Sequence, residues 1–516
     1  MSTEVAPLSE ATVPFEVVLI SPYELGRQPF ALAEPAALLK REAFAVTCLD
    51  LTLQKLDPEP LRWARLVAIH VGMHTATRIA VQALPRITRL ARQAHLCVYG
   101  LYAPMNEALL RGLGVGTLLG GEAELALLSL AQRLRTDATA LTQGATPMSP
   151  PPGRQGPRSG PCGAGSLPLG GTARSAKGAP ITQREPLISL GKVPFEVPDR
   201  SGLPELSRYA HLVLPDGSTR IAGFAEGSRG CKHLCRHCPV VPVYQGTFRI
   251  VPAGVVMDDI RQQVSVGATH ISFGDPDFFN GPTHGLRLAR ALHDQFPDLT
   301  FDATIKIQHL IDHAQLLPEL RRCGCLFITS AVEAVDDDIL RLLAKNHTSR
   351  DFDRVVALTR AAGIALAPTF VAFTPWTTLQ GYIALLERLL ELQLVESVPP
   401  VQLTIRLLVP AGSYLLQLPG FKEQLMAFDA RLLGYPWEHR DPRVDVLQRG
   451  LQTLVAQCEA QRLPRREVFA AVWRSAHEAA QRCAPKLTED LGAAIPRMSE
   501  PWYCCAEPTD LQLQSF

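Results

Sequence analysis

The stretch "GSRGCKHLCRHCPV", residues 227–240, places Cys231, Cys235 and Cys238 in a CxxxCxxC spacing. It follows a predicted β-strand that includes residues 222–225 and precedes a predicted helix. Three thiolates on one such loop can bind one face of a cubic iron–sulfur cluster and leave the fourth iron open. The spacing therefore predicts a 4Fe-4S cluster that these three cysteines hold.

A structural zinc site is the alternative reading of this loop. Zinc sites of that kind take four ligands, and His233 or His237 would have to supply the fourth. Both histidines lie inside the tight loop, where a tetrahedral arrangement with the three cysteines is awkward. The iron–sulfur interpretation is therefore favoured.

Residues 201–410 continue with β-like and helical segments in alternation. The segments predicted as strands are "STRIAGFAEG", "ATHISFGD", "LTFDATIKI", "CLFITSAVEA", "IALAPTFVAF" and "VQLTIRLLVP". Six β/α units predict a partial (β/α)6 barrel, about three quarters of the eight-unit form. Functional residues are expected at the carboxyl ends of its strands.

Residues 1–134 contain a separate alternation of short β-like runs, such as "FEVVLIS" and "RLVAIHVGM", with helical stretches. This pattern predicts a doubly wound parallel sheet, so the chain as a whole is of the α/β class. His70 and His74 lie at the predicted ligand-binding edge of this sheet. A loop histidine is more often solvated or capping than a ligand, and both readings stay open.

Two further regions complete the organisation. Residues 135–200 are rich in Pro, Gly and Ser, which predicts a flexible linker. Residues 411–516 are predicted to be mostly helical and end with "WYCCAEP", in which Cys504 and Cys505 are adjacent. A disulfide between neighbouring cysteines is strained, so soft-metal or metalloid binding, redox chemistry and chance all remain readings of this pair.

Composition limits the classes of partner. The chain has 516 residues, of which 47% are hydrophobic and 20% charged, and its formal net charge is +1. No excess of positive charge is present for phosphate backbones, so nucleic acid is not an expected partner. The N-terminal stretch lacks a basic, apolar leader, and no run reaches the roughly 20 apolar residues of a membrane span, so we expect a cytoplasmic protein without membrane association.

With these motifs, residues 202–410 resemble the radical S-adenosylmethionine (radical SAM) superfamily, whose signature is CxxxCxxC with an aromatic residue before the last cysteine. His237 occupies that position here. The resemblance implies that the open iron binds the amino and carboxylate groups of S-adenosylmethionine, and that cluster reduction cleaves the sulfonium to give a carbon radical. It also implies a small-molecule substrate and an electron donor such as flavodoxin or ferredoxin.

The second predicted strand ends in "FGDPDFFN", where this family has a Gly-Gly-Glu-like motif that holds the methionyl amino group. The sequence departs from that motif. Gly274 and Asp275 are its best matches and Asp277 is a second candidate. A helix-capping turn is the alternative role, because Asp is a common N-cap residue.

Later strand ends supply the other predicted cofactor contacts. The period of two in a strand places Thr304 and Lys306 on one face, and the next strand presents Ser330 and Glu333. A buried charge without a partner is costly, so these side chains are predicted to bind the carboxylate and ribose of S-adenosylmethionine. Arg406 on the sixth strand could bind a carboxylate or brace the barrel.

Two segments are predicted to line the substrate side of the barrel. They are "KNHTSRD", residues 345–351, and "PTFVAFTPWTT", residues 368–378. Thr369, Thr374 and Trp376 are the candidate contacts in the second segment, although a tryptophan more often packs in a core.

The N-terminal region resembles the cobalamin-binding domains that precede many radical SAM barrels. Gly121, Glu122 and Glu124 match a Gly-Glu-x-Glu sequence that often ends such domains. The first loop, "SPYELGRQPF", lacks the histidine that holds cobalt in some members. The resemblance therefore leaves open whether this domain binds cobalamin or only shapes the active site.

The tail, together with the cysteine loop, resembles radical SAM proteins with a Cys-Cys-Ala-Glu-Pro tail, some of which carry selenocysteine at the first position. A reactive residue there implies that Cys504 and Cys505 are catalytic and bind a small thiophilic substrate containing arsenic or selenium. We thus expect a radical SAM enzyme, with a transferase favoured. A cobalamin-dependent radical SAM methyltransferase and a non-catalytic iron–sulfur or metalloid-binding protein are the alternatives.

Overall fold

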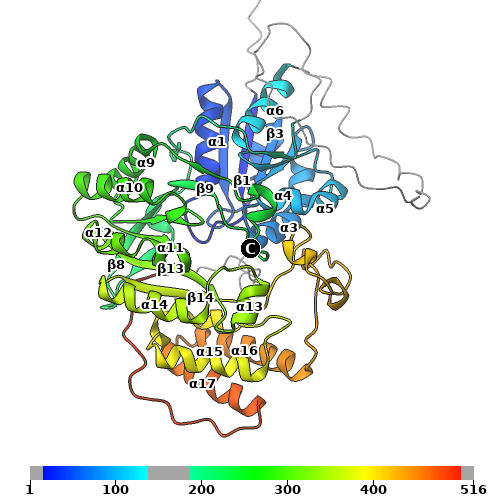
Figure 1. Ribbon diagram of the computed structural model, residues 1–516. Helices are drawn as coiled ribbons and strands as arrows, with labels where there is room; N and C mark the ends of the chain where they lie inside the picture. The colour runs from blue at the N-terminus through cyan, green and yellow to red at the C-terminus, as the bar shows by residue number, and fades with distance from the viewer. Residues whose placement is uncertain (1–14, 137–184, 501–516) are drawn as a thin grey trace, which may run out of the picture.

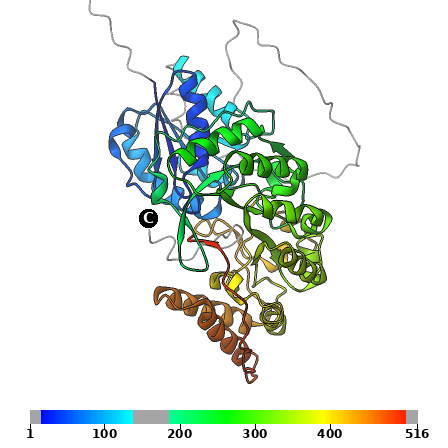
Figure 2. The same cartoon turned by 90° about the vertical axis from the view of Figure 1, so that its left-hand side faces the viewer.

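The computed structural model describes residues 15–136 and 185–500 (Figure 1). Cys504 and Cys505 lie outside the described residues. An N-terminal α/β unit packs beside a curled β/α sheet, and two long helices close the end of that sheet away from the N-terminal unit (Figures 1 and 2). The predicted fold class, an N-terminal parallel sheet followed by a partial barrel, is confirmed.

The N-terminal sheet is parallel throughout, with strand order β2-β1-β3-β4-β5-β6. Its strands are β1 (Glu16–Ser21), β2 (Ala45–Asp50), β3 (Leu66–His70), β4 (His95–Tyr99), β5 (Thr117–Gly121) and β6 (Ile188–Ser189). Strands buried on both faces need apolar residues at nearly every position, and "EVVLIS" of β1 shows this pattern. Strand β6 comes from the segment predicted as linker and adds the edge strand.

Helices cover both faces of this sheet, as a doubly wound fold requires. One face packs against α1 (Phe30–Arg41) and α6 (Glu124–Thr136), whose leucines join Val17, Leu19 and Leu119 in one apolar cluster. The other face packs against further helices, with Val18 and Ile20 in a second cluster. These are α2 (Pro58–Trp63), α3 (His74–Leu90), α4 (Tyr102–Met105) and α5 (Glu107–Gly112).

The second sheet has the order β14-β13-β12-β11-β8-β7-β15. Its strands are β7 (His211–Val213), β8 (Thr219–Ala225), β11 (His270–Phe273), β12 (Thr300–Thr304), β13 (Cys325–Glu333), β14 (Ala365–Phe370) and β15 (Arg497–Met498). Strands β8 and β11 to β14 are parallel, whereas β7 and β15 add antiparallel partners at one edge. Five of the six predicted barrel strands therefore form as regular strands.

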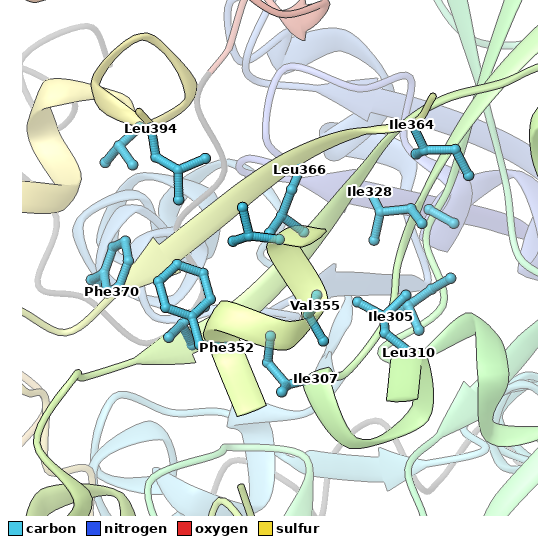
Figure 3. Packing of buried hydrophobic residues seen from close by; sticks show 14 of the residues in the cluster. Ile305, Ile307, Leu310, Ile328, Phe352, Val355, Ile364, Leu366, Phe370 and Leu394 are labelled. Carbon is cyan, nitrogen blue, oxygen red and sulfur yellow. The ribbon is translucent and has the colours of Figure 1, made fainter. Parts of the chain in front are cut away.

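Helices between these strands pack their apolar faces on the sheet. They are α9 (Ala253–Ser265), α10 (Pro282–Gln295), α11 (Ile307–Asp312), α12 (Leu317–Arg322), α13 (Asp337–Leu342), α14 (Ser349–Ala361) and α15 (Leu379–Glu391). Figure 3 shows the packing at α14, where Phe352 and Val355 lie close to Leu366 and Phe370 of β14. This shared core holds the strand ends in fixed positions.

The predicted sixth strand, "VQLTIRLLVP", differs from expectation. Pro400–Leu403 forms a 3-10 helix, and Arg406 contributes only an isolated parallel bridge to Phe373. Two consecutive prolines, Pro399 and Pro400, precede the bridge, and proline has no N–H to donate to a strand ladder. The barrel is therefore open after β14.

The C-terminal part forms turns and short 3-10 helices before α16 (Pro442–Ala460) and α17 (Arg465–Ala479). Apolar residues of both helices, including Leu447 and Phe469, join the barrel core. The chain then returns to the opposite edge, where β15 pairs with β7. Within residues 15–136 and 185–500 we find no helix with the length and apolarity of a membrane span.

Candidate iron–sulfur and cofactor site

The cysteine loop is held between two short antiparallel strands, β9 (Ser228–Gly230) and β10 (Phe248–Ile250), and it leads into α8 (Val241–Tyr244). Gly230 adopts a φ of +73°, and a Cβ there would lie 2.4 Å from the ring of Tyr244. Only glycine fits this position without strain. Asn280 donates to the carbonyl of Gly230 at 3.1 Å and accepts from the backbone N–H of Lys232 at 3.2 Å, which fixes the backbone on both sides of Cys231.

One cavity brings the three cysteines together with residues from the barrel strand ends. The predicted site residues that line it are Cys231, Cys235, Cys238, His237, Asp277, Thr304, Lys306 and Glu333. Thr369 from the segment expected on the substrate side also lines it, as do Lys345 and Gln402. Groups separated by up to about 170 positions in sequence thus share one site.

The donor set of this cavity fits an iron–sulfur cluster. None of the three cysteines is in a disulfide, and all three line the same cavity. Burial raises the pKa of the Cys231 thiol to about 11, so the free thiol stays protonated and a bound metal would be needed to hold the thiolate. Lys306 and Lys345 lie close enough to Cys235 to interact with it electrostatically, so two cationic side chains adjoin the cysteine ligands.

His237 is held by a buried carboxylate. Its Nε2 lies 3.0 Å from Oε1 of Glu333, and Nζ of Lys345 lies 3.3 Å from the same oxygen. Burial alone would raise the pKa of Glu333, but Lys345 and His237 together lower it to about 2. Glu333 therefore stays ionised and ties the loop residue His237 to the end of β13.

Lys306 and Asp277 line the same cavity but differ in their hydrogen bonding. Nζ of Lys306 is buried and has no hydrogen-bond partner among the described residues, and burial lowers its pKa. Oδ1 of Asp277 accepts from the N–H of Phe279 at 3.1 Å, the capping role expected as an alternative. Its Oδ2 points toward His233 and His309.

Four of the predicted cofactor contacts do not line the cavity, and neither do Thr374 and Trp376 from the predicted substrate side. Asp275 accepts from the N–H of Gly227 and the hydroxyl of Ser228, so it fixes the start of the cysteine loop. Ser330 donates to the carbonyl of Ile305 at 2.7 Å. Gly274 and Arg406 are the other two.

Gly274 and Arg406 have packing roles in the described structure. A Cβ at Gly274 would lie 2.0 Å from the ring of Phe224, so the strand end and that ring could not approach as they do. Arg406 pairs with Asp445 at 2.7 Å and lies over the ring of Trp437, 3.5 Å from its centroid. Of its two predicted roles, these contacts correspond to bracing the barrel.

The N-terminal unit contacts the cysteine loop through Arg229, two positions before Cys231. The guanidinium forms ion pairs with Glu122, Glu124 and Glu226, and a further one with Glu34. Glu122 and Glu124 are the residues that match the cobalamin-domain sequence. In this structure their carboxylates bind the chain's own arginine.

Other ends of the N-terminal strands also bind protein groups. Asp50 accepts from the hydroxyl of Tyr209 at 2.7 Å, and Nε2 of His74 lies 2.5 Å from the carbonyl oxygen of Leu432. Burial lowers the pKa of His70 and of His74 to about 4, so both are neutral near pH 7. These contacts do not identify a corrin site.

Sequence reasoning did not single out three residues of this site. Lys345 begins the segment expected on the substrate side, so its position was foreseen but its pairing with Glu333 was not. His309 lies on α11 and carried no motif. Arg229 lies within the quoted cysteine loop, and its four carboxylate partners come from distant segments that only the fold brings together.

Comparison with known protein families identifies the central region. Residues 226–375 match the radical SAM superfamily. Among curated proteins, a tRNA-2-methylthio-N(6)-dimethylallyladenosine synthase from Mannheimia succiniciproducens is 25% identical over 244 residues, which cover 41% of this chain and 50% of that protein. The enzyme of the same name from Haemophilus influenzae is 24% identical over 248 residues, with 42% and 50% covered. The chain spans about half the length of these relatives.

Solved structures share the arrangement of a larger part of the chain. The cobalamin-dependent S-adenosylmethionine radical enzyme OxsB, in its apo form, has a TM-score of 0.61 at 14% identity, covering 87% of this chain and 67% of OxsB. The radical S-adenosylmethionine methyltransferase TsrM from Kitasatospora setae, with its tryptophan substrate and an S-adenosylmethionine analogue bound, has a TM-score of 0.52 at 18% identity, covering 73% of this chain and 71% of TsrM. These similarities show a common fold.

The family match falls on the barrel, and it includes the three cysteines that line the cavity. A 4Fe-4S cluster and S-adenosylmethionine are the cofactors of such a domain. Residues 226–375 of the barrel therefore match a radical SAM domain, with the three cysteines at its cavity.

Proposed function

We propose that the enzyme uses the carbon radical derived from S-adenosylmethionine to modify a small molecule, and that the reaction is a group transfer. The observation that carries this proposal is the cavity in which Cys231, Cys235 and Cys238 face the charged side chains of Lys306 and Glu333. One electron delivered through the bound cluster would break a sulfonium carbon–sulfur bond, leaving a thioether and a carbon radical that takes its hydrogen from the substrate.

The residues around the cluster ligands have the charges that the cofactor requires. S-adenosylmethionine carries a carboxylate and an ammonium group besides its sulfonium. The ammonium of Lys306, buried and without a hydrogen-bond partner among the described residues, would donate to the carboxylate. His237 and Glu333 would hold the loop in position through their mutual contact.

A small substrate agrees with the charge of the chain better than an RNA does. The curated relatives carry tRNA in their names, but they match over about half of their length. The formal net charge of +1 supplies no excess of cations for a phosphate backbone. A substrate of nucleoside size or smaller is therefore proposed.

Anaerobic reconstitution with iron and sulfide, followed by assay for S-adenosylmethionine cleavage, tests the proposal. The wild-type protein is expected to bind close to four irons and to release a deoxyadenosine product that mass spectrometry identifies. Cys235→Ala should lose both properties. Cys483→Ala, which changes an exposed cysteine far from the loop, should retain both. Absence of cleavage in the wild type under a strong reductant would exclude the proposed chemistry.

A cobalamin-dependent methyltransferase is the second candidate. The N-terminal parallel sheet and the fold shared with OxsB and TsrM over 87% and 73% of this chain favour it. Methyl transfer would convert S-adenosylmethionine to S-adenosylhomocysteine besides the deoxyadenosine product. Gel filtration after incubation with hydroxocobalamin, with the corrin absorption measured on the protein peak, distinguishes this candidate. Without bound corrin, the N-terminal unit would have a positioning role only.

The substrate class is a further part of the proposal and rests on the sequence. Adjacent thiols bind trivalent arsenic or selenium compounds well, and Cys504 and Cys505 provide such a pair. Replacing both by Ala should leave the iron content and the cluster absorption unchanged but abolish turnover of the thiophilic substrate. Full turnover by the double variant would show that the pair is not catalytic.

A further inference from the structure

A second group of potential metal ligands adjoins the cysteine loop. His233 comes from the loop itself, Asp277 from the end of β11, and His309 from α11. Each residue offers one ligand atom, and these atoms lie within 4.8 Å of one another. Nε2 of His233 lies 3.6 Å from Oδ2 of Asp277, and Nδ1 of His309 lies 2.6 Å from the same oxygen.

The closest contact in this group is not a regular hydrogen bond. Oδ2 of Asp277 and Nδ1 of His309 are both buried, and neither has a hydrogen-bond partner of acceptable geometry. The two residues are only 1% and 3% exposed. The two atoms are held together as an ion pair without a well-formed hydrogen bond, so their lone pairs are available to a cation that binds between the side chains.

Burial and charge both favour a cation at this point. The buried carboxylate of Asp277 lies between the imidazoles of His233 and His309, so three donor atoms converge on one point. Two imidazoles and one carboxylate are a ligand set typical of zinc and of similar divalent metals, with a fourth position left for water or substrate. His233 and Asp277 also line the cavity, so a fourth ligand can come from there.

We propose that His233, Asp277 and His309 bind one divalent cation of the zinc type at the wall of the active-site cavity, separate from the iron–sulfur cluster. This site would hold a donor atom of the substrate close to the cluster. It uses none of the three cysteines and does not depend on which group the enzyme transfers. Asp277 would then act as a metal ligand and not as a contact of the methionyl amino group.

Metal analysis of the full-length protein with its cluster loaded provides the first test. After removal of loosely bound metal with EDTA, addition of zinc sulfate and gel filtration, the wild type is expected to carry one zinc per chain beside the cluster iron. His309→Ala should lower the zinc content at least tenfold with the iron content unchanged. His313→Ala, whose imidazole lies 5.9 Å from that of His309, should retain both metals.

A second test uses a variant that lacks the three cysteine ligands, so that no metal signal can come from the cluster. In the triple variant Cys231→Ser, Cys235→Ser and Cys238→Ser, added Co²⁺ is expected to give the visible absorption of a four- or five-coordinate ion without the sulfur-to-cobalt charge-transfer band of thiolate ligands. Adding His309→Ala should abolish that absorption. If the serine variant does not fold, as judged by circular dichroism, the zinc measurement on the cluster-loaded protein decides alone.

Two results would overturn the proposal. One is a cluster-loaded wild type that retains less than about a tenth of one zinc. The other is equal zinc retention by wild type, His309→Ala and Asp277→Asn, which would show that the metal binds elsewhere. In either case the three side chains form a buried ion-pair group without a metal, and the cluster chemistry proposed above would stand unaffected, because its readout is iron content and S-adenosylmethionine cleavage.

Discussion

Nζ of Lys345 lies 3.3 Å from Oε1 of Glu333, and the two side chains are 4% and 7% exposed. A buried ion pair contributes little net stability, but the loss of one partner leaves the other charge without compensation in a medium of low polarity. The pair also positions His237, which contacts the same carboxylate oxygen. Loss of the Lys345–Glu333 ion pair should therefore lower the stability of the barrel and also disturb the position of the cysteine loop.

Lys345→Met is expected to lower the free energy of unfolding by about 3–5 kcal/mol, because Glu333 keeps only His237 as a partner. Urea unfolding followed by fluorescence measures this change. Arg341→Met is the matched control, since its ion pair with Asp338 is 72% and 81% exposed and should contribute less than about 1 kcal/mol. Equal losses in both variants would contradict the importance of burial.

The effect of Lys345→Met should also depend on pH. Lys345 and His237 lower the pKa of Glu333 from 4.5 to about 2, so the stabilisation by the ionised carboxylate is present above about 4.5 and is lost as the pH falls through about 2. Glu333 raises the pKa of Lys345 above 10.5, so its contribution is present below that value. The difference in the free energy of unfolding between wild type and Lys345→Met should be largest between about pH 4.5 and 10.5 and should shrink below pH 4. A difference that stays constant down to pH 3 would contradict this account.

Lys306→Met separates cofactor binding from stability. Its buried ammonium has no hydrogen-bond partner among the described residues, so replacing it with an apolar side chain should leave the fold as stable as before or more stable. A charge-assisted hydrogen bond contributes about 1.5–3 kcal/mol, so loss of the contact to the cofactor carboxylate should weaken S-adenosylmethionine binding about 10- to 100-fold. Anaerobic calorimetry on the cluster-loaded protein measures the affinity.

The exposed Lys232 of the cysteine loop supplies the control for this experiment. Lys232→Met should leave both the iron content and the affinity for S-adenosylmethionine unchanged. If Lys306→Met binds the cofactor as tightly as the wild type does, the ammonium does not contact it.

The parts of the site that follow from local pattern could be predicted from the sequence. A strand followed at once by CxxxCxxC predicted the position of the cluster ligands, and the period of two placed Thr304 and Lys306 at the end of β12. These residues do line one cavity. Such predictions succeed because the carboxyl ends of parallel strands meet at one edge of a sheet.

Partnerships across the fold could not be predicted in the same way. Glu333 was expected to need a partner, but nothing local shows that Lys345 approaches it after a helix and a turn. The sequence left Arg406 with two possible roles, binding a cofactor carboxylate or bracing the barrel. Its ion pair with Asp445 on α16 corresponds to the second role. The sixth strand was predicted from the apolar run alone, but its first residues belong to the 3-10 helix Pro400–Leu403, and only an isolated bridge at Arg406 remains.

The contact between the N-terminal unit and the cysteine loop concentrates negative charge around Arg229. Its partners are Glu34 on α1, Glu122 and Glu124 after β5, and Glu226 after β8. One guanidinium cannot neutralise four ionised carboxylates, so proton uptake by at least one of them is favoured. Burial, and then repulsion from Glu122, raise the pKa of Glu124 to about 8.

The raised pKa predicts that stability falls with increasing pH. A carboxyl group with a folded-state pKa above its unfolded value stabilises the fold fully below about 4.5, and this contribution is lost as the pH rises through about 8. Glu124→Gln is permanently neutral, so its thermal midpoint should match that of the wild type at pH 5 and exceed it by several degrees at pH 9. Scanning calorimetry between pH 5 and pH 9 measures the thermal midpoints of the wild type and of Glu124→Gln. Glu107→Gln, which changes an exposed partner of Arg111, should show no such divergence. A midpoint of Glu124→Gln below that of the wild type at every pH would mean that Glu124 is ionised and that its pairing with Arg229 outweighs the cost of its burial.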